Sequence, residues 1–405
     1  MSNVSQKKNC MYTFRPFVFI KIVPKLLEGL PNAPKARSGH RVVCDDKNLY
    51  SFGGYNPSIH NDPDIRDDPV WLESRPLFKE LWKYNFASKM WKRVACKGSI
   101  PNELASNAVI LKGGTMMIFG GTGYPFGTTC SNQLYVCNLR EDYNMQLVNM
   151  EGSFPPKQYG QALVLDGPYL YTVGGTTGFD YTADVHRLDL RKGVWEEMYM
   201  CTGKAWREPQ GRYRHELAFD GTRIYLLGGG TAEEVYGFQE IPAFNLLTGL
   251  WENLTTRCDP EAPAPGIPAS RRCHGCVQML NSGQREAVAY VCGGYNGTEI
   301  FHDVWRLELH SLQWTHMRKC YLPYAVYFHS VAITPAGCMY SFGGIVGGEN
   351  NNRRTADVHC AWMCIPKLTE ICWEAILYYN PNLHSAPKER LLNCGLPLEF
   401  VNRIE

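Results

Sequence analysis

Two arginines, Arg214 and Arg272, each lie within an Arg-x-x-His segment of the sequence. A guanidinium can hold a carboxylate through two parallel hydrogen bonds, and it keeps its charge at physiological pH. Aromatic residues recur at related positions, and aromatic side chains exclude water around such a contact. This chemistry suits an anion with little bulk around it. The alternative for either arginine is a solvated position or a pairing with a nearby carboxylate. The candidate binding residues are Arg214, Arg272, Tyr213, Ser38, Tyr55, Tyr159, Tyr181, Tyr295 and Tyr327.

No comparable set of residues predicts catalysis. Cys273-x-x-Cys276 is a single pair on an expected strand, without the second pair that a zinc site needs. His215-Glu216 lacks the second histidine of a zinc protease, and Gly120 to Gly123 lacks the later glycine of a dinucleotide loop. We therefore predict a non-catalytic protein with no metal site and no cofactor.

The elements that position the candidate residues form an internal repeat. Six glycine pairs follow apolar strands, beginning at residues 53, 120, 174, 228, 293 and 343. An alternating strand follows most pairs, as in Asp184 to Asp189, and period-two alternation is typical of half-buried antiparallel strands. A tryptophan then follows in four repeats, at positions 91, 195, 251 and 314. The second repeat has no Arg-x-x-His segment, and Leu147 stands where we expect the tryptophan.

This pattern resembles the kelch repeat over residues 37 to 360, which implies an all-β, six-bladed β-propeller. The sixth repeat is one strand short after Asp357 to Met363. The unassigned apolar segment Phe14 to Val23 is predicted to supply that outer strand and to close the ring. The residues between the arginine and the histidine of each repeat would then face the mouth of the central channel.

The composition narrows the possible classes of partner. The 405 residues carry a formal net charge of +2, without the clustered positive excess of a nucleic-acid-binding surface. No signal segment and no membrane span are visible, and several of the sixteen cysteines lie in expected strands as small apolar residues. We predict a reduced, intracellular protein, both cytoplasmic and nuclear, that binds neither nucleic acid nor membrane.

The last forty residues have helical rather than strand-like patterns. We therefore expect three parts in the chain: an N-terminal arm at 1–13, a propeller at 14–365 and a helical tail at 366–405. Residues from Leu368 to Tyr379 have helical apolar spacing, and Asn380-Pro381 ends the helix. Leu368, Cys372 and Ile376 lie four apart on one face, and they resemble the BC-box that binds elongin B and elongin C. Leu396, Pro397, Phe400 and Ile404 resemble a cullin-2 box.

A kelch propeller with this tail resembles the kelch-domain receptors of cullin-2 RING ubiquitin ligases. The resemblance implies a substrate-recognition subunit that binds elongin B, elongin C, cullin-2 and a RING-box protein. It also implies a mouth that reads C-terminal degrons ending in small residues such as Gly or Ala, leading to ubiquitination and proteasomal degradation. The alternative is a kelch scaffold that regulates a signalling enzyme or the actin cytoskeleton, with a structural tail. A propeller enzyme is disfavoured because no copper or carboxylate constellation is visible.

Overall fold

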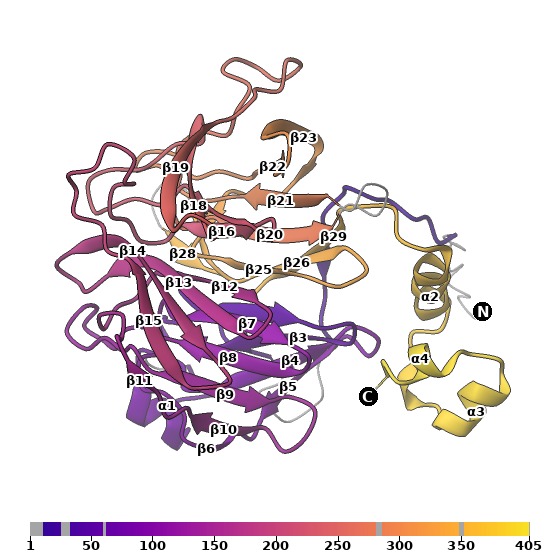
Figure 1. Cartoon of the computed structure of the whole chain (residues 1–405). Helices are drawn as coiled ribbons and strands as arrows, with labels where there is room; N and C mark the ends of the chain where they lie inside the picture. The colour runs from indigo at the N-terminus through magenta and orange to yellow at the C-terminus, as the bar shows by residue number, and fades with distance from the viewer. Residues whose placement is uncertain (1–10, 26–32, 60–61, 281–285, 348–351, 405) are drawn as a thin grey trace, which may run out of the picture.

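The computed structural model describes residues 11–25, 33–59, 62–280, 286–347 and 352–404, and the described chain is mostly β-strand. Six sheets of four or five strands follow one another along the chain (Figure 1). The first sheet contains β2 (Arg41–Cys44), β3 (Asn48–Phe52), β4 (Leu81–Asn85) and β5 (Met90–Val94). The second contains β7 (Ala108–Lys112), β8 (Thr115–Phe119), β9 (Leu134–Asn138) and β10 (Asn144–Leu147), and the short strand β6 (Lys97–Gly98) pairs with β10. The third contains β12 (Ala162–Asp166), β13 (Tyr169–Thr176), β14 (Tyr181–Asp189) and β15 (Val194–Tyr199), and the short strand β11 (Glu151–Gly152) pairs with β15.

The next three sheets repeat the antiparallel order. The fourth contains β16 (Glu216–Phe219), β17 (Arg223–Leu227), β18 (Glu240–Asn245) and β19 (Leu250–Thr255). The fifth contains β20 (Gly275–Leu280), β21 (Ala287–Cys292), β22 (Asp303–Glu308) and β23 (Gln313–Tyr321). The sixth contains β25 (Ser330–Ile333), β26 (Cys338–Phe342), β29 (Val358–Trp362) and β1 (Ile20–Ile22). A small seventh sheet joins β24 (Val326–Tyr327), β27 (Ile345–Val346) and β28 (Arg353–Arg354). We number the six larger sheets one to six in this order.

The first strands of the six sheets contact one another in a cycle, in the order β2, β7, β12, β16, β20, β25 and back to β2. The arrangement is therefore β-propeller-like. The outer strand of sheet six comes from the N-terminal segment, because β1 pairs antiparallel with β29, with Ile20 opposite Cys360 and Ile22 opposite Val358. The N-terminal strand was expected here, although it is shorter than the predicted segment Phe14 to Val23.

A closed belt of backbone hydrogen bonds surrounds the channel at one end of the first strands. Its members, which we call the ring residues, each donate N–H to the ring residue of the preceding sheet, at 2.8 to 3.3 Å. All have positive φ, between 54° and 70°, a conformation that favours glycine. A non-glycine residue in this conformation is strained unless its surroundings hold it, and here the belt does so. The ring residues are Gly39, Ser106, Gly160, Arg214, Cys273 and Phe328.

The flanking residues of the repeat hold the sheets together. Arg37, Arg212 and Arg271 are buried, and each donates to the carbonyl of the first glycine of its own sheet's pair, at 3.0 to 3.1 Å. In sheets one, three and four the residue after the ring residue is hydrogen-bonded to a carbonyl of the preceding sheet: His40 Nε2 to Phe342 at 3.1 Å, Gln161 Nε2 to Phe119 at 3.0 Å and His215 Nε2 to Val173 at 3.0 Å. These arginines and histidines are therefore parts of the frame.

The recurring tryptophans fill the spaces between neighbouring sheets. The ring centre of Trp195 lies 5.3 Å from that of Phe119 in sheet two, and the ring centre of Trp91 lies 5.3 Å from that of Phe342 in sheet six. In sheet two the prediction was wrong by two residues. Met145 is opposite Cys137, as Trp91 is opposite Tyr84, and Met145 is buried, whereas Leu147 is 40% exposed. An unbranched methionine fills this gap in place of tryptophan.

Four helical segments form the tail: α2 (Leu368–Tyr379), the 3₁₀ turn η1 (Leu383–Ser385), α3 (Lys388–Asn393) and α4 (Leu398–Val401). The predicted helix from Leu368 to Tyr379 is confirmed. The tail has its own apolar cluster, in which Trp373 packs on Phe400 at 5.2 Å. In Figure 1 the tail lies at the right, whereas β28 and α1 (Pro69–Ser74), which belong to loops beside the ring residues, lie at the left.

Candidate functional site

The mouth of the channel is built from a short hairpin that each sheet carries beside its ring residue. The residue before the ring residue forms a β-bridge with the chain just after the glycine pair, and that chain turns and bridges back to itself. We call the bridged residue just after each glycine pair the outgoing partner; the six are Tyr55, Thr122, Thr176, Gly230, Tyr295 and Ile345. After the turn, the outgoing partner bridges to a second residue of the same chain segment, which we call the returning partner; the six are Leu77, Cys130, Tyr181, Val235, Ile300 and Arg354. The residues before the ring residues are Ser38, Ala105, Tyr159, Tyr213, Arg272 and Tyr327. The predicted site residues are all members of these sets or of the ring.

Arg214 reaches from its ring position across the channel. Its Nη2 donates to Ser106 Oγ of sheet two, and its guanidinium lies 4.6 Å from the centre of the Phe328 ring of sheet six. The residue is only 7% exposed, its Nε has no hydrogen-bond partner, and burial lowers its pKa. Among the described residues, Arg214 has no carboxylate partner.

Two further arginines belong to the mouth hairpins of sheets five and six. Arg272 is half-buried, and its Nη1 has no hydrogen-bond partner. Arg354 donates from Nε to Ser38 Oγ at 2.8 Å and lies 4.8 Å above the Tyr55 ring. Within the described chain, neither forms an ion pair. A cationic side chain held without a carboxylate partner attracts an anion, so the three arginines form a floor suited to a carboxylate.

Aromatic side chains surround this floor in three groups. The ring centres of Tyr159 and Tyr181 lie 6.2 Å and 5.4 Å from that of Tyr213. The Tyr295 ring stacks on the Tyr327 ring with 5.1 Å between their centres. On the opposite side, Tyr55 stacks on Tyr124 at 5.5 Å and meets Phe126 at 4.8 Å. Burial raises the pKa of Tyr213 to about 12, so its hydroxyl stays protonated and can donate. The predicted tyrosines are thus brought together at one end of the channel.

Several polar residues next to the predicted site residues have structural roles. Asn56 Nδ2 donates to the Ala36 carbonyl at 2.7 Å, and Asn296 Oδ1 accepts from Glu299 N at 2.7 Å, so both stabilise their own loops. Cys273 is a ring residue rather than a strand residue, contrary to the prediction; only Cys276 lies in β20. Burial raises the pKa of the Cys273 thiol to about 11, so it is a neutral wall of the site.

An ion pair crosses the channel next to the ring residues. Arg41 begins β2 and Glu216 begins β16, which belong to sheets one and four, and their side chains meet at 2.7 Å. Both side chains are more than four-fifths buried. The pair joins sheets one and four two residues beyond the ring residues Gly39 and Arg214.

The tail occupies the other end of the sheets. Arg403 forms two hydrogen bonds to Glu370, at 2.7 and 2.8 Å, and its carbonyl accepts from Asn85 of sheet one at 3.0 Å. Tyr12 of the N-terminal segment donates from its hydroxyl to Glu374 at 2.7 Å. The tail is therefore attached to both sheet one and the N-terminal segment.

The residues predicted to bind elongins and cullin-2 differ in exposure. Leu368 is 73% exposed, Cys372 is exposed and Ile376 is half-buried. Of the predicted cullin residues, Pro397 is exposed and Leu396 half-buried, whereas Phe400 and Ile404 are buried in the tail's apolar cluster. Their roles stay predictions.

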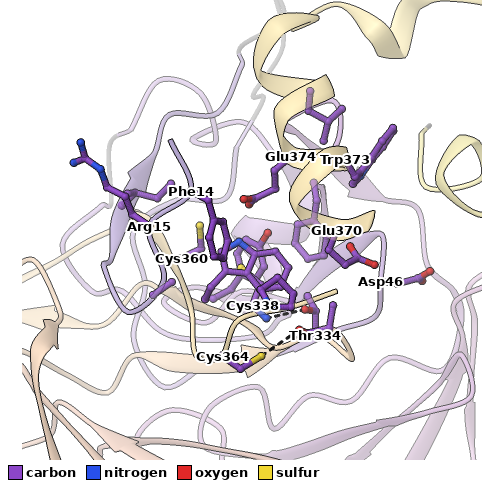
Figure 2. A pocket seen from close by; sticks show the side chains of 18 of the residues that line it. Phe14, Arg15, Asp46, Thr334, Cys338, Cys360, Cys364, Glu370, Trp373 and Glu374 are labelled. Atoms are coloured by element: carbon purple, nitrogen blue, oxygen red, sulfur yellow. Dashed lines mark hydrogen bonds between the residues drawn. The ribbon is translucent and has the colours of Figure 1, made fainter. Parts of the chain in front are cut away.

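A cavity of about 750 Å³ lies between α2, the N-terminal segment and sheet six (Figure 2). Phe14, Cys338 and Cys360 line it from one side, and Glu370 and Glu374 line it from α2. Burial raises the pKa of the Cys338 thiol well above its usual range, so this thiol is protonated and unreactive. Glu370 and Glu374 already bind Arg403 and Tyr12. Both carboxylates that α2 contributes to the cavity are therefore already hydrogen-bonded within the described chain.

Comparison with known proteins gives the family. Residues 25–229 and 199–376 match the KLHDC2/KLHL20/DRC7 Kelch-repeats domain. The chain is 43% identical to kelch domain-containing protein 10 of Xenopus laevis over 386 residues, which cover 95% of this chain and 90% of that protein. The human protein of that name is 41% identical over 388 residues, covering 95% and 83%, and the Drosophila melanogaster homolog is 40% identical over 407 residues, covering 97% and 66%. This chain belongs to the kelch domain-containing protein 10 family. The predicted resemblance to kelch repeats is confirmed.

In this kelch-repeat protein, sequence reasoning missed Arg354, Ser106 and the Arg41–Glu216 pair. Arg354 follows the sixth glycine pair, but the intervening segment is longer than in sheets three to five and conceals its equivalence to Tyr181. Ser106 lies between Ala105 and Asn107, where sheet two has neither the arginine nor the histidine that marks the position in sheets one, four and five. Arg41 directly follows the His40 of the repeat, and that position could have been compared across sheets.

Two features are absent from the described residues. No helix among them is long and apolar enough to span a membrane. Within the same residues, no group of three or more His, Cys, Asp or Glu side chains could hold a metal ion.

Proposed function

We propose that this protein is the substrate-recognition subunit of a cullin-2–elongin B/C RING ubiquitin ligase. The six sheets would be the blades of one kelch propeller closed by β1. Its mouth would bind C-terminal degrons ending in a small residue such as Gly or Ala, and the bound proteins would be ubiquitinated and degraded by the proteasome. The receptor itself would be non-catalytic and would act in the cytoplasm and the nucleus, with ubiquitin transfer directed by the RING-box protein.

The observation that carries this proposal is the set of unpaired arginines in the mouth. Arg214, Arg272 and Arg354 belong to the same mouth and have no carboxylate partner among the described residues, and aromatic side chains line the mouth around them. A buried charge without a partner is costly, and a bound carboxylate would relieve that cost. A C-terminal carboxylate fits because a small last residue lets it approach the crowded floor.

The tail supports the assembly half of the proposal. Leu368 and Cys372 are exposed on one face of α2, as binding to elongin C would require. They lie at the end of the molecule opposite the mouth, so a substrate and the ligase would not compete for space (Figure 1). Pro397 and Leu396 are the predicted cullin-2 residues with accessible surface, whereas Phe400 and Ile404 would support them from within.

One observation favours the alternative of a kelch scaffold that regulates a signalling enzyme or the actin cytoskeleton. The tail is held to sheet one by Arg403 and to the N-terminal segment by Tyr12, as a purely structural element would be. The two functions differ in whether the exposed face of α2 binds a partner.

Capture of elongin B, elongin C and cullin-2 by the purified chain tests this difference. We expect the wild type to capture all three and the Leu368→Ala/Cys372→Phe variant to lose them. The matched control is Leu392→Ala/Cys394→Phe, which makes the same changes at two exposed tail residues outside the BC-box. Failure of a folded wild type to capture elongins, or equal losses in both variants, would exclude the ligase assignment.

A further inference from the structure

The outer rim of the mouth carries negative charge at equivalent positions in three neighbouring sheets. In sheets three, four and five, the residue just before the returning bridge is Asp180, Glu234 or Glu299, which we call the tip acids. The same position holds Pro76 in sheet one, Thr129 in sheet two and Arg353 in sheet six. The acids therefore occupy one side of the rim only.

The three acidic turns share one conformation. In each turn the first residue donates its N–H to the carbonyl of the tip acid, at 2.8 to 3.2 Å. The side chain of that first residue, Thr177, Thr231 or Asn296, accepts from the N–H of the tip acid, at 2.7 to 3.2 Å. The backbone of the tip acids is thus fixed in the same way around the rim.

Within the described chain, the tip acids have no cationic partner. All three are exposed, and none forms an ion pair with another described residue; Glu234 accepts only a hydrogen bond from the Tyr236 hydroxyl, at 3.2 Å. The arginines of the floor carry the opposite charge. Arg214 is 7% exposed, and neither its Nε nor Arg272 Nη1 has a hydrogen-bond partner among the described residues. The mouth therefore presents a positive floor and a negative side wall, and no ion pair among the described residues neutralises either of them.

We propose that the mouth selects C-terminal segments that carry Lys or Arg a few residues before the terminal carboxylate. This inference rests on the proposed degron function and specifies its substrate class. A single anion would satisfy the floor and leave the tip acids unused. A peptide with a terminal carboxylate and an upstream cation matches both charges at once, and its polarity is then fixed by the mouth.

The spacing follows from chain geometry. The turns extend about two residues beyond the outgoing bridge, and an extended peptide rises about 3.3 Å per residue. A peptide whose last residue rests on the arginines would therefore pass the tip acids at about the third to fifth residue from its end. Exposed ion pairs of this kind contribute modestly and mainly speed and orient association, and their effect decreases with salt.

The test uses the full chain and fluorescent peptides of one neutral sequence ending in Gly or in Ala, with a free carboxylate. One set carries two lysines at the third to fifth positions from the end, a second carries two glutamates, and a third is the lysine set with an amidated terminus. The protein variant is Asp180→Asn/Glu234→Gln/Glu299→Gln. Its matched control, Glu141→Gln/Glu151→Gln/Glu389→Gln, removes the same charge from exposed acids without ion pairs outside the mouth.

We expect the lysine peptides to bind about fivefold or more tightly than the glutamate peptides at low salt. The difference should shrink in high salt and in the tip-acid variant, and it should persist in the matched control. Equal binding of lysine and glutamate peptides, or a preference unchanged in the tip-acid variant, overturns the inference while leaving carboxylate recognition intact. If the amidated peptides bind as well as the acids, the degron function itself fails.

Discussion

The mouth and the tail junction use arginines in opposite ways. At the junction, Arg403 forms two hydrogen bonds to Glu370 and lies 3.6 Å from Asp46, so its charge is paired inside the protein. In the mouth, Arg214, Arg272 and Arg354 have no carboxylate among the described residues. Paired arginines at one end hold elements together, and unpaired arginines at the other end are available to a ligand.

The same contrast occurs between two consecutive residues. Arg271 is fully buried and forms hydrogen bonds at 2.6 and 3.0 Å to the two oxygens of Asp303, whereas Arg272 turns toward Tyr295 and Tyr327 in the mouth. The repeat therefore places a structural arginine and a candidate binding arginine side by side. This pair offers the sharpest test of the comparison.

The largest effect on stability is expected for Arg271→Ala. Loss of one partner from a buried pair leaves Asp303 without its cation and typically costs about 3–5 kcal/mol in the free energy of unfolding. Arg272→Ala removes no ion pair and should cost about 0.5 kcal/mol or less. Urea unfolding of both variants measures the difference. Equal destabilisation would show that Arg272 also belongs to the frame.

Binding should show the reverse order. Arg272→Ala should weaken binding of a peptide with a free C-terminal Gly by about 2–5 kcal/mol, as for loss of one member of a desolvated charge pair. Arg214→Ala should act in the same direction. Fluorescence anisotropy measures the affinity, and the amidated peptide is the control, because its binding should be weak and insensitive to Arg272. If Arg272→Ala leaves the affinity of the free acid unchanged, the floor of the mouth does not bind the carboxylate.

The sequence predicted the sheets well because each repeat carries its own local signals. Glycine pairs at positive φ, alternating strands and the buried tryptophans all arise from contacts within one sheet or with its neighbour. The placement of Met145 was missed because the expected residue type was absent, and a register can then be found only from strand pairing.

The candidate site was predicted less completely. Arg214, Arg272 and the tyrosines were found because they lie at fixed offsets from the repeat signature. The contacts that make the site, such as Arg214 with Ser106 and Phe328, join sheets two, four and six across the channel. No local pattern encodes contacts between such distant residues. The tip acids, by contrast, lie at one fixed offset from the glycine pairs of sheets three to five, so a comparison of the repeats could have found them.

Acid should act on the frame beneath the mouth. Burial and the neighbouring Arg212 lower the pKa of His215 to about 3, so this histidine is neutral when folded and becomes protonated when unfolded below about pH 6.5. Because the unfolded state then binds more protons, His215 lowers stability progressively as the pH falls from about 6.5 to 3, by about 1.4 kcal/mol at pH 5.5.

His215→Gln isolates this effect, because Gln161 at the same position of sheet three already donates to the preceding sheet. We expect the variant to lose less stability than the wild type between pH 7.5 and 5.5, by about 1.4 kcal/mol, as measured by urea unfolding. Identical pH dependence in the two proteins would mean that His215 is not held neutral.

The smallest effect compares two tyrosine–glutamate contacts, one at each end of the molecule. The Tyr12 hydroxyl donates to Glu374 at the tail junction at 2.7 Å, and the Tyr236 hydroxyl donates to Glu234 at the rim of the mouth at 3.2 Å. Tyr12→Phe should destabilise the attachment of α2 by about 1 kcal/mol, since one hydrogen bond to a carboxylate is lost. Hydrogen exchange along α2 should then become faster.

Tyr236→Phe is the matched control. Glu234 is exposed, so water replaces the lost donor, and exchange in β17 and β18 should stay unchanged. Removal of the Tyr236 hydroxyl also frees Glu234 for an incoming cation, so binding of lysine-containing peptides should be equal or slightly tighter. If Tyr12→Phe leaves α2 as protected as before, the Tyr12 hydroxyl does not hold the tail, and other contacts of the junction, such as Arg403 with Glu370 and the Tyr12 backbone with Tyr379, account for it.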